Sequence, residues 1–221
     1  MLNVYTMTRI LINNKLKLNH HGLRVKASDN TWIDLHCQQG RLDGACAVYS
    51  LVMALLSIGY LEETDINVYQ KLDQRTAKGR FLHHLLEEQG MVRDGYSLMT
   101  LSKEIRRYCE DLEVVYHHKE EILLEKIIKD VQDNNPVVIG IENEEMSHAI
   151  LVVGIEYDDK ERIQKMFCLD PGFPLSGTAY WNCVIVLNST SGKYAYRYMT
   201  DISSSSKVNI TDMLMIKNNR C

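Results

Sequence analysis

Cys46 and the segment before it carry the residue types of a thiol nucleophile. Cys46 directly precedes a long apolar stretch, and Gln39 and Gln38 lie seven and eight residues before it. The N-terminus of a helix carries a partial positive charge, which favours the thiolate over the thiol. A glutamine amide can donate a hydrogen bond to a developing oxyanion. The segment 38–46 therefore predicts the nucleophile and the oxyanion donor of a hydrolase, with Gln39 as the first candidate donor and Gln38 as the alternative.

The residues after Cys46 predict the helix that such a nucleophile needs. Apolar side chains recur at the spacing of one helix face, at Val48, Leu51, Val52, Leu55 and Leu56. Asp43 is in position to cap a helix whose first turn holds 44–46, and Gly59 is in position to end it. The alternative interpretation is that Cys46 is a small buried apolar residue without chemistry.

His148 and Asp170 are the predicted partners of the thiol. His148 opens an apolar strand pattern that runs to 155, and Asp170 follows a second pattern over 165–169. A hairpin turning at Asp159 would place 148 and 170 opposite each other, so both side chains would share one face. An aspartate beside an imidazole fixes its tautomer and supports its charged form. The alternatives are a hydrogen-bonded histidine at a strand end and an Asp-Pro-Gly turn, and Asn182 is the reserve partner for the ring.

Composition narrows the class of protein. The chain has 221 residues, of which 45% are hydrophobic and 24% charged, and its net charge is −4. This is typical of a single globular domain. No basic cluster alternates with aromatic residues, so we expect no nucleic-acid partner. No apolar stretch reaches the ~20 residues that cross a membrane, and residues 1–18 lack the pattern of a signal peptide. We expect a cytoplasmic protein, or an effector exported by another route, without a membrane partner.

The six cysteines predict neither a disulfide framework nor a metal site. They are scattered along the chain, at Cys37, Cys46, Cys109, Cys168, Cys183 and Cys221. Such spacing favours reduced thiols, and no zinc-ligand pattern is present. We therefore expect no metal and no cofactor.

The element pattern changes from helical to extended near residue 135. Helices are expected at 46–60, within 68–89, at 98–109 and at 120–132. Strands are expected at 4–12, 112–116, 137–141, 148–155, 165–169, 178–187 and 194–199, with a surface loop at 203–206. The order predicts one α+β domain over 1–221, with a helical lobe at about 30–134, a β lobe of antiparallel strands at about 135–217 and a cleft between them.

These motifs resemble those of papain-like cysteine peptidases. The run 43–55 with Gly59 is similar to their nucleophile helix, and 147–158 followed by 169–172 is similar to the histidine strand and Asp-Pro turn of one branch, the bacterial double-glycine leader peptidases and their stand-alone relatives. Ala47-Val48 stands where many relatives have Gly-Pro. The resemblance implies a papain-like fold whose central nucleophile helix packs on the antiparallel sheet.

The same resemblance implies roles for four residues. Cys46 would be the nucleophile and His148 the general base and acid. Asp170 would orient the imidazole, and Gln39 would hold the oxyanion. The expected function is hydrolysis of peptide bonds in a peptide or protein substrate through an acyl-enzyme. The alternatives are an amidase or isopeptidase effector with the same triad, and an inactive papain-like binding module.

Overall fold

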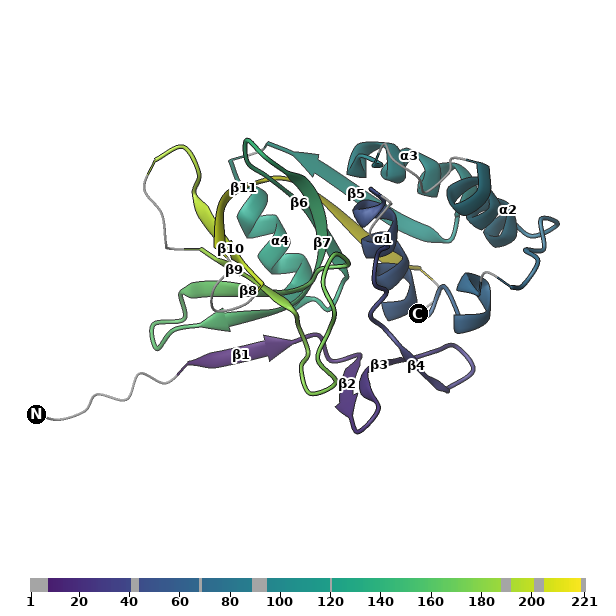
Figure 1. Ribbon diagram of the computed structural model, residues 1–221, viewed down its shortest axis with the longest axis horizontal. Helices are drawn as coiled ribbons and strands as arrows, with labels where there is room; N and C mark the ends of the chain where they lie inside the picture. Colours follow the sequence, from purple (N-terminus) through teal and green to yellow (C-terminus); the bar gives the residue numbers. More distant parts are fainter. Residues whose placement is uncertain are drawn as a thin grey trace, which may run out of the picture.

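An antiparallel sheet forms the centre of the protein. The computed structural model describes residues 8–40, 44–67, 69–88, 95–119, 121–187, 192–200 and 205–219. The eight strands of the main sheet are β1 (Arg9–Ile12), β5 (Leu112–His118), β6 (Val137–Glu142), β7 (Ser147–Tyr157), β8 (Ile163–Leu169), β9 (Cys183–Val186), β10 (Tyr196–Met199) and β11 (Ser205–Asn218). Seven of them follow the order β1-β7-β6-β11-β10-β9-β8, β7 also pairs with β8, and β5 pairs with β11 outside this path. The strands from β7 round to β8 therefore close into a ring (Figure 1).

Two long strands of this ring, β7 and β11, also pair with strands that lie outside it. On one edge, β7 pairs first with β6, up to Val152, and then with β1, from Gly154. In the same way, β11 pairs with β10 up to Val208 and with β5 from Asp212. Strands from outside the predicted β lobe thus belong to the main sheet.

Sequence patterns missed two parts of the β structure. A separate three-stranded sheet is formed by β2 (Leu16–Asn19), β3 (Gly22–Lys26) and β4 (Trp32–Asp34). The second part is β11, whose first residues Ser205 and Ser206 fall in the predicted surface loop. Residues 203–204, the rest of that loop, lie outside the described residues. The loop prediction was wrong at 205–206 because these serines pair with β10.

Helices cover both faces of the main sheet (Figure 1). They are α1 (Cys46–Ser57), α2 (Ala77–His83), α3 (Leu98–Tyr108) and α4 (Leu123–Gln132), with a 3₁₀ turn η1 (Glu63–Ile66) and a π-helical turn η2 (His84–Glu88). Helices α1, α2 and α3 share one apolar core with one face of the sheet. Helix α4 packs its buried side chains on the opposite face, inside the ring. The prediction of a mixed helix and strand fold is confirmed.

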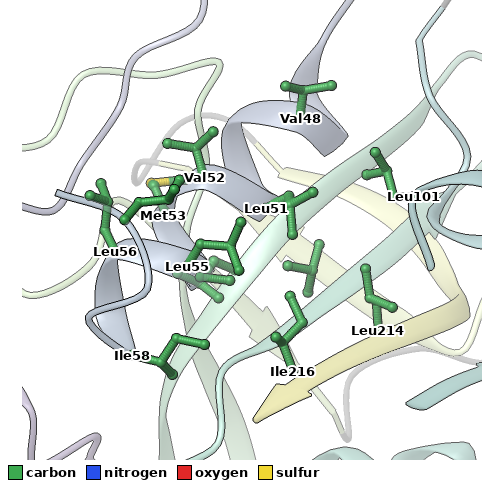
Figure 2. Close-up of a cluster of buried hydrophobic side chains, with 14 of the residues drawn as sticks. Val48, Leu51, Val52, Met53, Leu55, Leu56, Ile58, Leu101, Leu214 and Ile216 are labelled. Carbon is green, nitrogen blue, oxygen red and sulfur yellow. The ribbon is translucent and has the colours of Figure 1, made fainter. Parts of the chain in front are cut away.

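Helix α1 is held in place by its apolar surface. Ten of its twelve residues are buried, among them Leu51 and Leu55. Figure 2 shows these leucines in one cluster with Leu214 and Ile216 of β11. Burying a leucine side chain contributes about 1.5–3 kcal/mol, and truncating one to alanine in a packed core costs about 2–5 kcal/mol. This packing fixes the N-terminal end of α1, where Cys46 lies. None of the described helices has the length and apolar character needed to cross a membrane.

Candidate active site

Cys46 is the first residue of α1. Ala45 is the N-cap residue, so Gly44 and Ala45 precede the helix and do not form its first turn as predicted. The predicted cap, Asp43, lies outside the described residues. Backbone N–H groups in the first turn of a helix lack partners within the helix. The Cys46 thiol therefore lies where the helix favours a negative charge.

His148 is close to this thiol because α1 is bonded to β7. The buried Ser50 hydroxyl, one turn after Cys46, donates to the carbonyl of Ala149 over 3.0 Å. Ala149 is the residue after His148 in β7. His148 and the backbone N–H groups of Ala47 and Ala149 all interact with the Cys46 thiol.

His148 and Asp170 meet despite a shifted hairpin register. A hairpin centred on Asp159 would pair Leu151 with Phe167, but the structure pairs Leu151 with Leu169, two residues farther along. The turn is centred on Lys160, because Tyr157 already pairs with Ile163, and the two irregularities farther along the β7–β8 pairing cancel each other. A shift of two residues keeps every side chain on the same face, because side chains alternate with period two. His148 Nε2 lies 2.8 Å from Asp170 Oδ1.

Asp170 is fully buried, and both of its carboxylate oxygens form hydrogen bonds. Its Oδ1 also accepts a hydrogen bond from the Gly172 N–H at 2.6 Å, and its Oδ2 accepts one from the Tyr198 hydroxyl. Burial and the charge of Asp170 raise the pKa of Tyr198, so this hydroxyl keeps its proton. The carboxylate is therefore held by three donors, and its one ion-pair partner among the described residues is His148.

Asn182 and His36 hold the backbone of Asp170. Asn182 Oδ1 accepts from the Asp170 N–H at 2.7 Å, and its Nδ2 donates to the Asp170 carbonyl at 2.8 Å. His36 Nε2 lies 3.1 Å from the same carbonyl. Burial lowers the pKa of His36, which favours its neutral form. The sequence offered Asn182 as an alternative partner for the His148 ring, whereas in the structure Asn182 contacts the main chain of Asp170.

The pKa values of Cys46 and His148 shift in opposite directions. Burial alone would raise the pKa of the Cys46 thiol, but the hydrogen bond and charge of His148, with two backbone N–H groups, lower it. Burial likewise opposes the charged form of His148, but Asp170 and Cys46 raise its pKa to about 10. The arrangement favours a thiolate–imidazolium pair at neutral pH.

A cleft of about 560 Å³ lies over Cys46 and His148. One wall is the segment from Gly95 to Leu98, which leads into α3 and touches Gly44 so closely that a Cβ at Gly95 would lie 2.7 Å from the Gly44 carbonyl oxygen. The other wall is the sheet, through residues of β5, β6, β7 and β11. This volume is in the range of ligand-binding pockets.

Residues 30–204 match the Peptidase_C39-like family. The match spans more than half of the chain. The chain therefore belongs to the Peptidase_C39-like family. The narrower prediction of a double-glycine leader peptidase branch stays a prediction.

The other comparisons do not extend this assignment. No curated protein matches the chain. Among solved structures, the chain is similar to UfSP from C. elegans, with a TM-score of 0.49 and 15% sequence identity over 98% of this chain. The chain spans only 38% of the UfSP chain.

In this Peptidase_C39-like chain, Gln39 lies beside the turn that carries Asp170. Its backbone N–H donates to the Pro171 carbonyl over 2.7 Å. Gln39 is half-buried, whereas Gln38 is exposed. Of the two candidate oxyanion donors, Gln39 is therefore the one that is bonded to the turn carrying Asp170. Its role in catalysis stays a prediction.

Three of the other described cysteines differ from Cys46 in their electrostatics. All of them are free thiols. Burial, with the charge of Asp34, raises the pKa of Cys37 to about 11, and burial raises that of Cys109 to about 11. Burial also raises the pKa of Cys183. Cys221 lies outside the described residues. Within the described part of the chain, no three His, Cys, Asp or Glu side chains are grouped to hold a metal ion.

Sequence reasoning missed Tyr198, Ser50 and the backbone contact of Asn182. Tyr198 and Asn182 reach Asp170 from 28 and 12 residues away in the chain. Ser50 reaches Ala149 across 99 residues. No local pattern carries such contacts, because they depend on strand pairing and on how α1 packs on β7.

Proposed function

We propose that this chain is a cysteine peptidase in which Cys46, His148 and Asp170 form a catalytic triad. The observation that carries the proposal is the pair of contacts made by His148, to the Cys46 thiol and to Asp170 Oδ1. Membership of the Peptidase_C39-like family supports the same reaction class. Because Nε2 faces Asp170, Nδ1 is the nitrogen left to exchange a proton with the thiol and the substrate.

The first half of the proposed reaction forms an acyl-enzyme. The Cys46 thiolate attacks the scissile carbonyl carbon, and the carbonyl electron pair moves onto oxygen. The Cys46 backbone N–H and the Gln39 side-chain amide hold this oxyanion. The oxyanion collapses as His148 transfers its proton to the amide nitrogen, the C–N bond breaks and the amine leaves.

The second half releases the acid. His148, now neutral, takes a proton from water, and the hydroxide attacks the thioester. The C–S bond breaks, the thiolate is restored beside the imidazolium, and the product leaves as a carboxylic acid that gives its proton to water. Asp170 orients the ring throughout, as the aspartate does in serine proteases.

Iodoacetamide labelling at neutral pH tests the nucleophile. The pKa of Cys37 is about 11, whereas that of Cys46 is lowered below 9.0. The thiolate population of Cys46 therefore exceeds that of Cys37 by at least about 100-fold. A low-pKa thiolate is also an intrinsically weaker nucleophile, which reduces the expected ratio of alkylation rates by about tenfold. Peptide mapping should show Cys46 alkylated at least about ten times faster than Cys37.

Peptide cleavage tests the reaction itself. A mixture of unstructured peptides is incubated with the protein, and new termini are identified by mass spectrometry. Cleavage should occur with wild type and with the matched control Cys37→Ala, and should be lost with Cys46→Ala. Reaction with lysine-linked isopeptides alone would assign the triad to an isopeptidase. Retained cleavage in Cys46→Ala, or the absence of any hydrolysis by wild type, would overturn the proposal.

A further inference from the structure

One wall of the cleft carries a carboxylate that the proposed reaction does not use. Asp212 lies on β11, beside Gly140 of β6 and His118 of β5. All three residues line the cleft together with Cys46 and His148. Asp212 belongs to the face of the sheet that carries Leu214, the face covered by α1 and α3. Its side chain therefore faces the space between the two walls.

A bulge and a glycine position this carboxylate. The pairing of β11 with β6 skips Thr211, which is the extra residue of a β-bulge. Bulges re-aim side chains and are frequent beside active sites. Asp212 Oδ1 lies over Gly140, only 1.9 Å from where a Cβ on that residue would be. Only glycine at position 140 leaves room for the carboxylate here.

The hydrogen bonds of Asp212 come from neutral hydroxyl groups. Tyr116 Oη donates to Oδ2 at 3.3 Å, and Thr211 Oγ1 donates to Oδ1 at 3.1 Å. Within the described part of the chain, no ion pair includes Asp212. Burial raises the pKa of Asp212, the two hydroxyl hydrogen bonds and the charge of His118 oppose this rise, and the charge of Glu142 adds to it. An incoming cation would offset this cost of ionisation.

The remaining lining residues favour a basic group over other ligands. Glu142 is a second carboxylate on the same wall, and the opposite wall from Gly95 to Leu98 carries no charged side chain. The acidic groups are not arranged as a metal site among the described residues. An acidic substrate group would meet like charge on this wall, whereas a lysine or arginine side chain would form a partly desolvated ion pair.

We propose that Asp212 is a specificity-determining residue that binds a lysine or arginine side chain of the peptide substrate, near the bond attacked by Cys46. This inference rests on the proposed peptidase function. It assigns the substrate class, namely peptides with a basic residue close to the scissile bond. Glu142 adds to the negative potential of the subsite, and Tyr116 and Thr211 hold the Asp212 carboxylate in place.

Matched electrophilic peptides test the subsite. The probes are acetyl tripeptide vinyl sulfones with arginine at either of the two positions nearest the electrophile, each compared with citrulline, which has nearly the same shape and no charge. Second-order rate constants for labelling of Cys46 are measured by intact mass. At one position, wild type should react about tenfold faster with arginine, which corresponds to about 1.4 kcal/mol of discrimination.

Variants connect the preference to Asp212. In Asp212→Asn the arginine-to-citrulline ratio should fall to about 1. In Gly140→Ala, which displaces the carboxylate, the ratio should also fall. The matched control is Glu113→Gln, an exposed carboxylate farther along β5, which should keep the wild-type ratio. If Asp212→Asn does not fold, as judged by circular dichroism, the wild-type probe pairs and Gly140→Ala decide the question.

The outcomes separate this inference from the proposed function. Labelling of Cys46 by both probes at equal rates in wild type would overturn the basic subsite and leave the peptidase proposal standing. An arginine preference that persists in Asp212→Asn or in Gly140→Ala would likewise overturn the assignment to Asp212. Failure of every probe to label Cys46 would overturn the proposed function, and the subsite with it.

Discussion

Asp170 and Asp212 lie on opposite faces of the main sheet, and each accepts a hydrogen bond from a tyrosine hydroxyl. Asp170 is fully buried inside the ring, and its other oxygen contacts His148. Asp212 is half-buried in an open cleft, and no cationic side chain is paired with it within the described residues. Two carboxylates with similar hydrogen-bond donors thus differ in what they are suited to bind. In the proposed function, a sealed carboxylate paired with His148 orients the catalytic ring, whereas an accessible carboxylate that forms no ion pair among the described residues is suited to bind a charged group from outside.

The largest expected difference between the two aspartates is in the pH dependence of turnover. The pKa of His148 is raised to about 10, so the imidazolium is present below that pH and is lost as the pH rises through it. Activity should fall along an alkaline limb near pH 10. Asp170→Asn removes the carboxylate that holds the proton, so the limb should move to lower pH and turnover should drop by about 10²-fold or more. Asp212→Asn should leave the position of the limb unchanged.

Rate–pH profiles for the two variants check this expectation. A limb that moves equally in both would show that Asp170 and Asp212 act on His148 through their charge alone, without distinct roles. A limb that stays in place in Asp170→Asn would remove Asp170 from the triad.

The two tyrosines provide a smaller and sharper comparison. Tyr198→Phe removes a buried donor from a carboxylate that has no access to water, whereas Tyr116→Phe removes one from a carboxylate in the cleft. A buried hydrogen bond to a charged group contributes about 1.5–3 kcal/mol. Tyr198→Phe should lower the free energy of unfolding by that amount, and Tyr116→Phe by less than about 1 kcal/mol. Urea denaturation measures both, and equal losses would contradict the difference in burial.

The smallest expected effect concerns the bond that holds Cys46 near His148. Ser50→Ala removes the hydroxyl that joins α1 to the carbonyl of Ala149. The matched control is Ser57→Ala, because the Ser57 hydroxyl is also buried but donates to Ala54 within the same helix. Each should cost about 1 kcal/mol of stability. Only Ser50→Ala should lower the rate of Cys46 alkylation, by a few-fold, and an equal loss in Ser57→Ala would exclude a positioning role for Ser50.

The parts of the site that the sequence predicted are those encoded by local patterns. The apolar spacing after Cys46 predicted a helix, and α1 occupies 46–57. The strand patterns around His148 and Asp170 predicted a shared face, and their side chains are 2.8 Å apart. The predicted register was wrong by two residues. The two side chains still share a face, because a shift by an even number of residues does not change the face on which a side chain lies. The division into lobes near residue 135 stays a prediction.

The parts that the sequence did not predict depend on β11. Its residues mix polar and apolar types without strict alternation, and the bulge at Thr211 breaks the period. Without β11, nothing in the sequence relates Asp212 to Gly140 or to His118. Tyr198 was predicted only as part of a strand, because its contact with Asp170 depends on how β8, β9 and β10 curve round the ring.

The alternation of faces along β6 and β7 has a consequence for how this protein can vary. His148 pairs with Ile141, which packs inside the ring, whereas Ala149 pairs with Gly140, the neighbour of Asp212. Changes on the Gly140 face therefore reach the cleft wall without disturbing the contacts of His148 with Asp170. Under the proposed function, single substitutions at 140 or 212 would alter substrate preference while Cys46, His148 and Asp170 stay in place, so relatives with the same three residues need not share the same substrates.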